Sequence, residues 1–310
     1  QMGASVTTAR HGGLPVSIDG AITPIPITYR PPVASAQIKS AVLLAGLNAP
    51  GTTTVIETLP TRDHTENLLR VFGAEVSIEE MGSESHIALV GQPELRAQDV
   101  IVPGDPSSAA FPLVAALITR DSKVMVQGVG VNDRRTGLFQ CLLEMGAELS
   151  IDPVETACGE PVANLTARTS SLKGIEVPAE RAPCMIDEYP ILAMAAACAH
   201  GTTVMHGLRE LRLKESDRLA AIEEGLRGCG VETLVEDDVL TVVGNGPDSI
   251  PEGGGWVATQ QDHRIAMAFL ILGLAAKKAI TVDDGLMIAS SYPGFVEDMS
   301  ILGASISGSG

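Results

Sequence analysis

Hydrophobic and polar positions form one pattern that is repeated along the chain. An apolar segment of helical length is followed by a short β-branched segment, a segment of mixed polarity, and a glycine step into another β-branched segment. Long apolar segments are typical of buried helices, and short β-branched ones of strands. The pattern predicts four copies of one α/β unit, with elements at residues 35–47, 52–56, 65–72 and 73–76; 107–118, 123–127, 136–145 and 146–149; 187–199, 202–205, 216–229 and 230–232; and 262–276, 280–282, 293–302 and 303–305.

A glycine follows the second helix of each copy, at Gly73, Gly146, Gly230 and Gly303. Glycine readily adopts the positive φ that ends a helix and turns the chain into a strand. Successive glycines are roughly 70 to 85 residues apart, too far for a solenoid repeat. Each copy is therefore expected to be a βαβαββ unit, closed by strands such as residues 86–90 and 239–243.

The first residues do not complete such a unit. Residues 2–6 and 14–18 look like the closing hairpin of a further copy whose helices are not in the sequence. We therefore expect the chain to be truncated, cleaved or separated from an upstream segment. The turn residues 103–106 separate the first copy from the other three and predict a hinge.

Composition narrows the class of protein. The chain is 45% hydrophobic but only 3% aromatic, which favours helices packed on sheets. A net charge of -17 argues against a nucleic-acid partner. The five cysteines form no C-x-x-C pair, so neither disulfides nor a metal site is predicted. Apolar runs at 41–47, 191–198 and 265–276 are too short or too interrupted to span a membrane and predict buried helices. No signal peptide is recognised, so the cytoplasm is expected.

Unusual polar residues occupy the predicted helix starts. First helices open at residues 35–37, 187–190 and 262–264, and second helices at residues 62–65 and 214–218. Helix N-termini present unpaired N–H groups and a positive dipole, so several that converge would bind an anion. Phosphate-binding glycine loops of nucleotide sites are absent from the sequence, and we expect no cofactor.

Simpler interpretations exist for these residues. The set Ser35, Thr65, Asp187, Ser216 and Asp262 contains ordinary N-cap residues. Lys214 and Arg218 could lie on a solvated face, although two cations at i and i+4 of a helix repel each other. Arg264 is harder to explain, because a cation at a helix N-terminus opposes the helix dipole.

These residues resemble the EPSP synthase (3-phosphoshikimate 1-carboxyvinyltransferase) family. The Lys-Glu-Ser-Asp-Arg motif at 214–218 is a specific mark of that family, and further blocks match in order at residues 34–41, 61–66, 103–108 and 262–267. The resemblance implies an α/β fold of two lobes, each an inside-out α/β barrel of three βαβαββ units. Residues 1–103 would be a partial first lobe (closing hairpin plus one unit), and residues 104–310 the second lobe of three units.

The family transfers the enolpyruvyl group of phosphoenolpyruvate to the 5-hydroxyl of shikimate 3-phosphate and releases phosphate. By resemblance Asp187 is the catalytic base and Glu215 the catalytic acid. The residues implied to bind shikimate 3-phosphate are Ser35, Ala36, Gln37, Arg62, Asp187 and Lys214. The residues implied to bind phosphoenolpyruvate are Gln37, Arg218 and Arg264.

The resemblance also implies small-molecule partners only, with no membrane and no metal, and a monomer that needs the upstream segment. Ser290 stands where many members carry a lysine, which resembles the second class of these enzymes, often tolerant of glyphosate. Two alternatives stay open. One is the related enzyme that transfers enolpyruvyl to UDP-N-acetylglucosamine, and the other is a non-catalytic fragment or subunit of the same fold.

Overall fold

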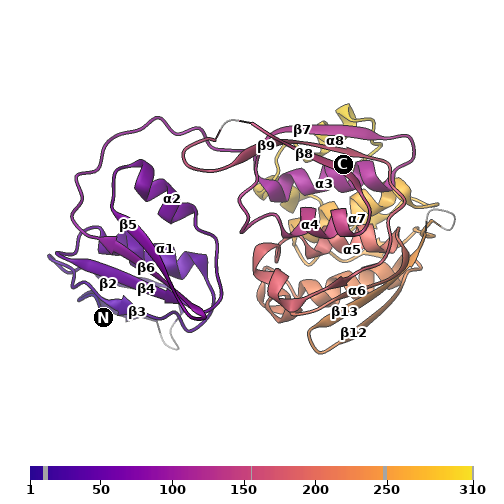
Figure 1. The fold of residues 1–310 in the computed structure, drawn as a ribbon. Helices are drawn as coiled ribbons and strands as arrows, with labels where there is room; N and C mark the ends of the chain where they lie inside the picture. Colours follow the sequence, from indigo (N-terminus) through magenta and orange to yellow (C-terminus); the bar gives the residue numbers. More distant parts are fainter. Residues whose placement is uncertain (10–12, 155, 247–249, 309–310) are drawn as a thin grey trace. The chain divides into compact units, whose positions relative to one another are not determined.

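A computed structural model of the chain describes residues 1–9, 13–154, 156–246 and 250–308. These residues form two compact units (Figure 1). Unit 1 comprises Gln1–Val102 and Thr156–Glu160, and unit 2 comprises Pro103–Glu155 and Pro161–Gly310. A short segment from the second half of the sequence therefore belongs to unit 1. No helix among the described residues is long and apolar enough to cross a membrane.

Unit 1 contains a hairpin and one βαβαββ copy. Antiparallel strands β1 (Ser5–Thr8) and β2 (Val16–Asp19) confirm the predicted hairpin. The copy runs through β3 (Thr28–Tyr29), α1 (Ala36–Gly46), β4 (Thr52–Glu57), α2 (His64–Val71), β5 (Val76–Met81) and β6 (Glu84–Val90). Its sheet has the order β3-β4-β6-β5, with β3 and β4 parallel and the other pairs antiparallel.

Unit 2 contains the other three copies. The second copy comprises α3 (Pro106–Ile118), β7 (Lys123–Gly130), α4 (Gly137–Glu144), β8 (Glu148–Pro153) and β9 (Val162–Arg168). The third comprises β10 (Glu176–Val177), η2 (Ala179–Cys184), α5 (Tyr189–Ala197), β11 (His200–Met205), η3 (Leu208–Leu213), α6 (Arg218–Gly228), β12 (Glu232–Glu236) and β13 (Val239–Asn245). The fourth comprises β14 (Trp256–Val257), α7 (His263–Ala275), β15 (Thr281–Val282), η4 (Leu286–Ser290) and α8 (Phe295–Ile301).

The third copy repeats the sheet of the first, because its order β10-β11-β13-β12 has the same parallel pair and the same antiparallel pairs. In the second copy a parallel bridge between Gly104 and Val129 takes the place of the first strand beside β7. The predicted repeat is therefore observed in both units.

Glycine ends the second helix of every copy as predicted. The φ angles of Gly73, Gly146, Gly230 and Gly303 are 94°, 85°, 78° and 98°. One prediction at these steps is wrong. Residues 303–305 form no strand among the described residues 250–308, and Ala304 packs against the core instead.

The buried helices lie in unit 2. Every residue of α5 is buried, as are most residues of α3 and α7, and these three helices pack against one another. Helix α1 differs, because only Lys39, Leu43 and Gly46 are buried in it. The prediction of a buried helix is therefore confirmed for the runs at 191–198 and 265–276 and is wrong for much of the run at 41–47.

Candidate active site

Polar residues at the N-terminal ends of the packed helices contact one another in unit 2. Ser107, in the first turn of α3, donates a hydrogen bond to Glu188, the residue before α5. Arg218, the first residue of α6, pairs with Asp187 ahead of α5 and with Asp262 at the N-cap of α7. Four helix starts therefore meet, and three of them, those of α5, α6 and α7, are among the starts that the sequence predicts to converge.

Arg218 is the centre of this cluster. Its side chain is 0% exposed. Its guanidinium donates hydrogen bonds to three carboxylates, through Nε to Asp262 Oδ2 at 2.7 Å, Nη1 to Asp187 Oδ1 at 3.1 Å, and Nη2 to Glu215 Oε2 at 2.5 Å. Burial alone would lower the pKa of Arg218, but the bond to Asp262 and the charges of Glu215 and Asp187 raise it above its usual value. The group is therefore a permanent cation.

Asp262 joins two helix starts. Its Oδ1 accepts the backbone N–H of Arg264 at 2.9 Å and so caps α7, while its Oδ2 accepts Arg218 and the Ser216 hydroxyl, the latter at 3.1 Å. The side chain is fully buried. A fully buried carboxylate needs a cation and hydrogen bonds to offset desolvation, and Asp262 has both. The sequence pattern identified Asp262 only as a cap.

Arg264 lies in the same cluster. Its Nη1 is 3.4 Å from the backbone oxygen of Asp187 and 3.9 Å from Glu188 Oε1. Asp187 therefore contacts both arginines, one through its side chain and one through its backbone. The pKa of neighbouring His263 is lowered by burial and by the charge of Arg264, which favours its neutral form.

Two cap predictions are wrong, because the N-caps are Asp63 for α2 and Glu188 for α5, where Thr65 and Asp187 were predicted. At the start of α6 both Ser216 and Asp217 could cap the helix, and Asp217 is the N-cap. Asp217 accepts the N–H of Ala220, and the Ser216 hydroxyl is engaged by Asp262. The caps Ser35 and Asp262 are confirmed.

Lys214 does not share a helix face with Arg218, because α6 begins only at Arg218 and Lys214 directly follows η3. Lys214 Nζ donates to Glu210 Oε1 at 2.6 Å, so its charge is paired within its own segment. Glu215 holds Arg218 with one oxygen while its side chain is about half exposed. The 214–218 motif is therefore an extended entry into α6.

The remaining predicted residues belong to unit 1. Ser35 caps α1 by accepting the N–H of Ile38 at 3.4 Å, and Ala36 and Gln37 form the first turn of that helix. Arg62 lies two residues before α2. The starts of α1 and α2 are adjacent, because the hydroxyls of Ser40 and Thr65 are 2.6 Å apart.

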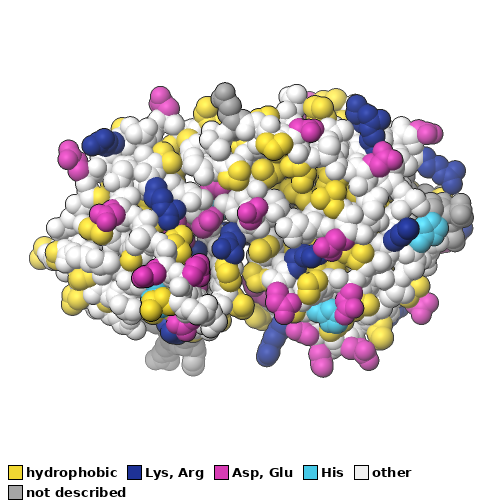
Figure 2. Space-filling view, viewed as in Figure 1, with side chains coloured by type: hydrophobic (Ala, Val, Ile, Leu, Met, Phe, Trp, Pro, Cys, Tyr) yellow, Lys and Arg dark blue, Asp and Glu magenta, His cyan; other side chains and the backbone are white. Residues whose placement is uncertain are grey.

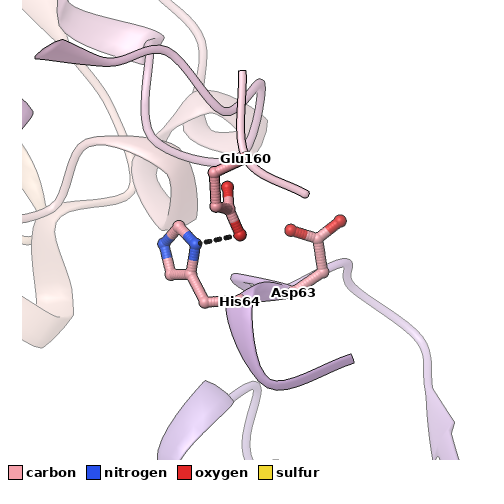
Figure 3. A group of neighbouring side chains, drawn as sticks. All are labelled: Asp63, His64 and Glu160. Carbon is pink, nitrogen blue, oxygen red and sulfur yellow. Dashed lines mark hydrogen bonds and ion pairs between the residues drawn. The ribbon is translucent and has the colours of Figure 1, made fainter. Parts of the chain in front are cut away.

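Asp63, His64 and Glu160 form a separate group in unit 1 (Figure 3). Their possible ligand atoms lie within 4.8 Å of one another, a spacing that could suit a metal ion. His64 Nδ1 lies 2.9 Å from Glu160 Oε1, and Asn67 donates to the same oxygen at 3.1 Å. The positive N-terminal end of α2 also opposes a cation. We therefore regard this group as a hydrogen-bonded clasp that holds residues 156–160 on unit 1.

The surface supports a small-molecule site over a nucleic-acid site. On the face drawn in Figure 2, basic side chains are scattered among acidic ones and do not gather into one patch. Binding to a nucleic-acid backbone needs a concentrated basic surface. Arg218 and Arg264 instead lie together among carboxylates at the helix starts of unit 2.

Comparisons with known proteins agree with the motifs. The family model described as EPSP synthase (3-phosphoshikimate 1-carboxyvinyltransferase) matches residues 1–299. The 3-phosphoshikimate 1-carboxyvinyltransferase of Methylobacterium sp. (strain 4-46) is 60% identical over 98% of this chain and 68% of its own length. The chain thus spans about two thirds of that relative.

Solved structures agree with the fold. EPSP synthase from Acinetobacter baumannii is 41% identical, with a TM-score of 0.88 over 99% of this chain and 69% of its own. The enolpyruvyl transferase NikO from Streptomyces tendae is 25% identical, with a TM-score of 0.75 over 98% of this chain and 69% of its own. The predicted enolpyruvate transferase fold is confirmed by these matches. Sequence, fold and family model agree, and the chain belongs to the EPSP synthase family.

Proposed function

We propose that this protein transfers the enolpyruvyl group of phosphoenolpyruvate to the 5-hydroxyl of shikimate 3-phosphate, giving 5-enolpyruvylshikimate 3-phosphate and phosphate. Membership in the EPSP synthase family supports the reaction. The observation that carries the proposal is the pair Arg218 and Arg264 held beside the carboxylates of Asp187 and Glu215. Two fixed cations suit a multiply anionic substrate, and two carboxylates suit proton transfer.

The proposed roles follow from the chemistry. Asp187 takes the proton of the 5-hydroxyl of shikimate 3-phosphate while the oxygen of that hydroxyl bonds to C2 of phosphoenolpyruvate. Glu215 donates a proton to the methylene carbon of phosphoenolpyruvate. The resulting tetrahedral intermediate then loses phosphate, which takes up the proton held by Asp187, and Glu215 takes a proton back from the methyl group as the double bond is restored. The steps are an addition and an elimination assisted by proton transfer, without a change of redox state, so we propose that no cofactor takes part.

Arg218 and Arg264 would bind the phosphate and carboxylate of phosphoenolpyruvate, because planar guanidinium groups match such oxygens in pairs. Both lie at helix N-termini, where an anion is also favoured by the dipole. A bound anion would offset the unfavourable position of Arg264 at the start of α7.

The residues proposed to bind shikimate 3-phosphate are Ser35, Ala36, Gln37, Arg62, Asp187 and Lys214. Gln37 would contact both substrates. Lys214 must exchange its partner Glu210 for substrate oxygen, since its ammonium is already paired. We propose that residues 1–103 are a partial first lobe and residues 104–310 the second lobe of the family fold.

The oligomeric state, the partners and the location of the protein are also proposals. We propose a monomer whose partners are these small molecules, located in the cytoplasm, where its five free cysteines would stay reduced. Transfer to UDP-N-acetylglucosamine is disfavoured, because the matching family model is that of EPSP synthase.

Phosphate release tests the proposal. The protein should release phosphate from phosphoenolpyruvate when shikimate 3-phosphate is added, but not when UDP-N-acetylglucosamine is added. The Glu215→Gln variant should lose about 100-fold in kcat, the usual contribution of a general acid. Glu144→Gln is the matched control, because Glu144 pairs with Arg181 away from the cluster. Unchanged turnover in Glu215→Gln would remove Glu215 from the chemistry, and no phosphate release by the unaltered protein would remove the proposed function.

A further inference from the structure

Glu188 is a buried carboxylate that the proposed reaction does not use. It directly follows Asp187, and its side chain is 2% exposed. Its Oε1 accepts a hydrogen bond from Ser107, whereas its Oε2 has no hydrogen-bond partner among the described residues. An unsatisfied oxygen on a buried carboxylate is costly, so the position calls for an explanation.

A line of polar contacts connects Glu188 to three other segments. Arg135, just before α4, donates to Asp105 Oδ1 at 3.0 Å and to Ser107 Oγ at 2.7 Å. The Ser107 hydroxyl then donates to Glu188, whose carboxylate lies 3.9 Å from Arg264 Nη1. This line fixes the carboxylate between the starts of α3, α5 and α7.

The charges of Arg135 and Arg264 both act on this carboxylate. Burial, the largest influence, leaves the pKa of Glu188 raised above its usual value, although the two arginines and the Ser107 bond oppose the shift. Arg264 donates a long hydrogen bond of 3.4 Å to the Asp187 carbonyl and stands where the α7 dipole repels it. Through its ion pair at 3.9 Å, Glu188 supplies a carboxylate that offsets the position of Arg264 at the start of α7.

We propose that Glu188 is a positioning residue that aims Arg264 at phosphoenolpyruvate, an inference that rests on the proposed function. Oε2 of Glu188 has no partner among the described residues and can accept a hydrogen bond from Arg264 if the arginine moves. Oε1 can meanwhile keep its hydrogen bond from Ser107. Because Arg264 is assigned to phosphoenolpyruvate, the loss of Glu188 acts on that substrate and not on shikimate 3-phosphate. Ser107 supports the same function one step further away.

Steady-state kinetics of Glu188→Gln test the division between substrates. Glutamine keeps the size of the side chain and an acceptor for Ser107 but removes the charge. The KM for phosphoenolpyruvate should rise about tenfold, the equivalent of about 1.4 kcal/mol. The KM for shikimate 3-phosphate should change less than about twofold, and Ser107→Ala should shift the phosphoenolpyruvate KM in the same direction by less. Equal rises of both KM values, or no rise, would overturn the proposal.

Calorimetric binding of phosphoenolpyruvate to the same proteins, with and without shikimate 3-phosphate, separates this inference from the reaction itself. If Glu188 acts through Arg264, the double variant Glu188→Gln, Arg264→Gln should bind no more weakly than Arg264→Gln alone. Additive losses would show that Glu188 acts elsewhere. Glu188→Asp serves if the glutamine variant does not fold, and Glu144→Gln should bind as the unaltered protein does. A protein that binds phosphoenolpyruvate in this pattern but releases no phosphate would contradict the proposed function alone.

Discussion

Helices α1 and α5 hold the same place in two copies of one unit, yet they are buried to different extents. All of α5 is buried, whereas Leu44 of α1 is 51% exposed. Both helices are rich in alanine and leucine, so composition does not explain the difference. In unit 2, α3 and α7 cover the faces of α5 that its own sheet leaves open, while α1 packs mainly on β4 and β6. An apolar helix in this fold is therefore buried by the corresponding helices of the other copies.

The two units also bury cations differently. Unit 1 buries Lys39 inside α1, with Nζ 3.1 Å from Glu57 and 2.7 Å from Glu66. Unit 2 buries Arg218 at a helix start, where its planar fork reaches three carboxylates. Lysine presents one point of charge, whereas arginine presents a fixed geometry. The comparison fits a stabilising function for the first cluster and the binding function proposed above for the second.

The largest effect is expected for Arg218→Ala. Removal of the guanidinium leaves Asp262 buried without its cation, which should cost about 3 to 5 kcal/mol of unfolding free energy. The kcat/KM for phosphoenolpyruvate should fall by at least about 100-fold. Urea denaturation and steady-state kinetics measure these changes. The control is Arg227→Ala on the same helix, because Arg227 forms an exposed pair with Glu223 and should matter by less than about 1 kcal/mol. Equal losses for both substrates would contradict the assigned function of Arg218.

Truncation of one leucine in each helix tests the burial contrast directly. Leu192→Ala in α5 should cost about 2 to 5 kcal/mol, because it opens a cavity in a closed core. Leu44→Ala in α1 should cost less than about 1 kcal/mol, since that side chain already contacts solvent. Chemical denaturation gives both values. A large cost for Leu44→Ala would mean that this face of α1 is covered in solution.

A smaller effect is expected at the buried lysine cluster. Burial raises the pKa of Glu66 above its ordinary value of 4.5, although Lys39 opposes the shift. The folded state therefore favours the protonated form, and the stability contributed below pH 4.5 is lost as the pH rises through the raised pKa. Glu66→Gln should remove this loss, so that the free energy of unfolding of the variant falls less between pH 4 and 8 than that of the unaltered protein. Denaturation at several pH values between 4 and 8 measures how the free energy of unfolding changes with pH, with exposed Glu94→Gln as the control. A steeper pH dependence in Glu66→Gln would refute the explanation.

The smallest effect is expected at the clasp of Asp63, His64 and Glu160. His64→Ala removes one partly exposed pair, worth less than about 1 kcal/mol. Hydrogen exchange of residues 157–160 should accelerate a few-fold while α2 keeps its protection. His206→Ala, which removes the comparable pair with Glu176 in unit 2, should leave this segment unchanged. Unaltered exchange in His64→Ala would show that other contacts hold the segment.

The sequence predicted the helices and strands, because these depend on residues that are close together in the chain. Periodicity and glycine steps placed most helices and strands within about two residues, because both are local. Helix starts were less certain where two capping residues compete, as Ser216 and Asp217 do. In the structure Asp217 caps α6, while the Ser216 hydroxyl donates to Asp262, which is far away in the sequence.

Contacts between distant segments could not be read from the chain. The repeat indicated that helix starts converge, and so led to Arg218 and Arg264. It gave no sign of the bond from Ser107 to Glu188, which spans 81 positions, or of the burial of Lys39. A cation inside an apolar helix was the available signal for the latter, since such a residue must find carboxylates.

The guanidinium of Arg218 is paired with three carboxylates, so its charge is already neutralised before any ligand binds. An anion that reaches it must exchange with Glu215, the most exposed of the three partners. Such an exchange trades one counter-ion for another and changes the local net charge little. Affinity for an anionic ligand at Arg218 should therefore vary only weakly with ionic strength, unlike capture by an open cationic surface.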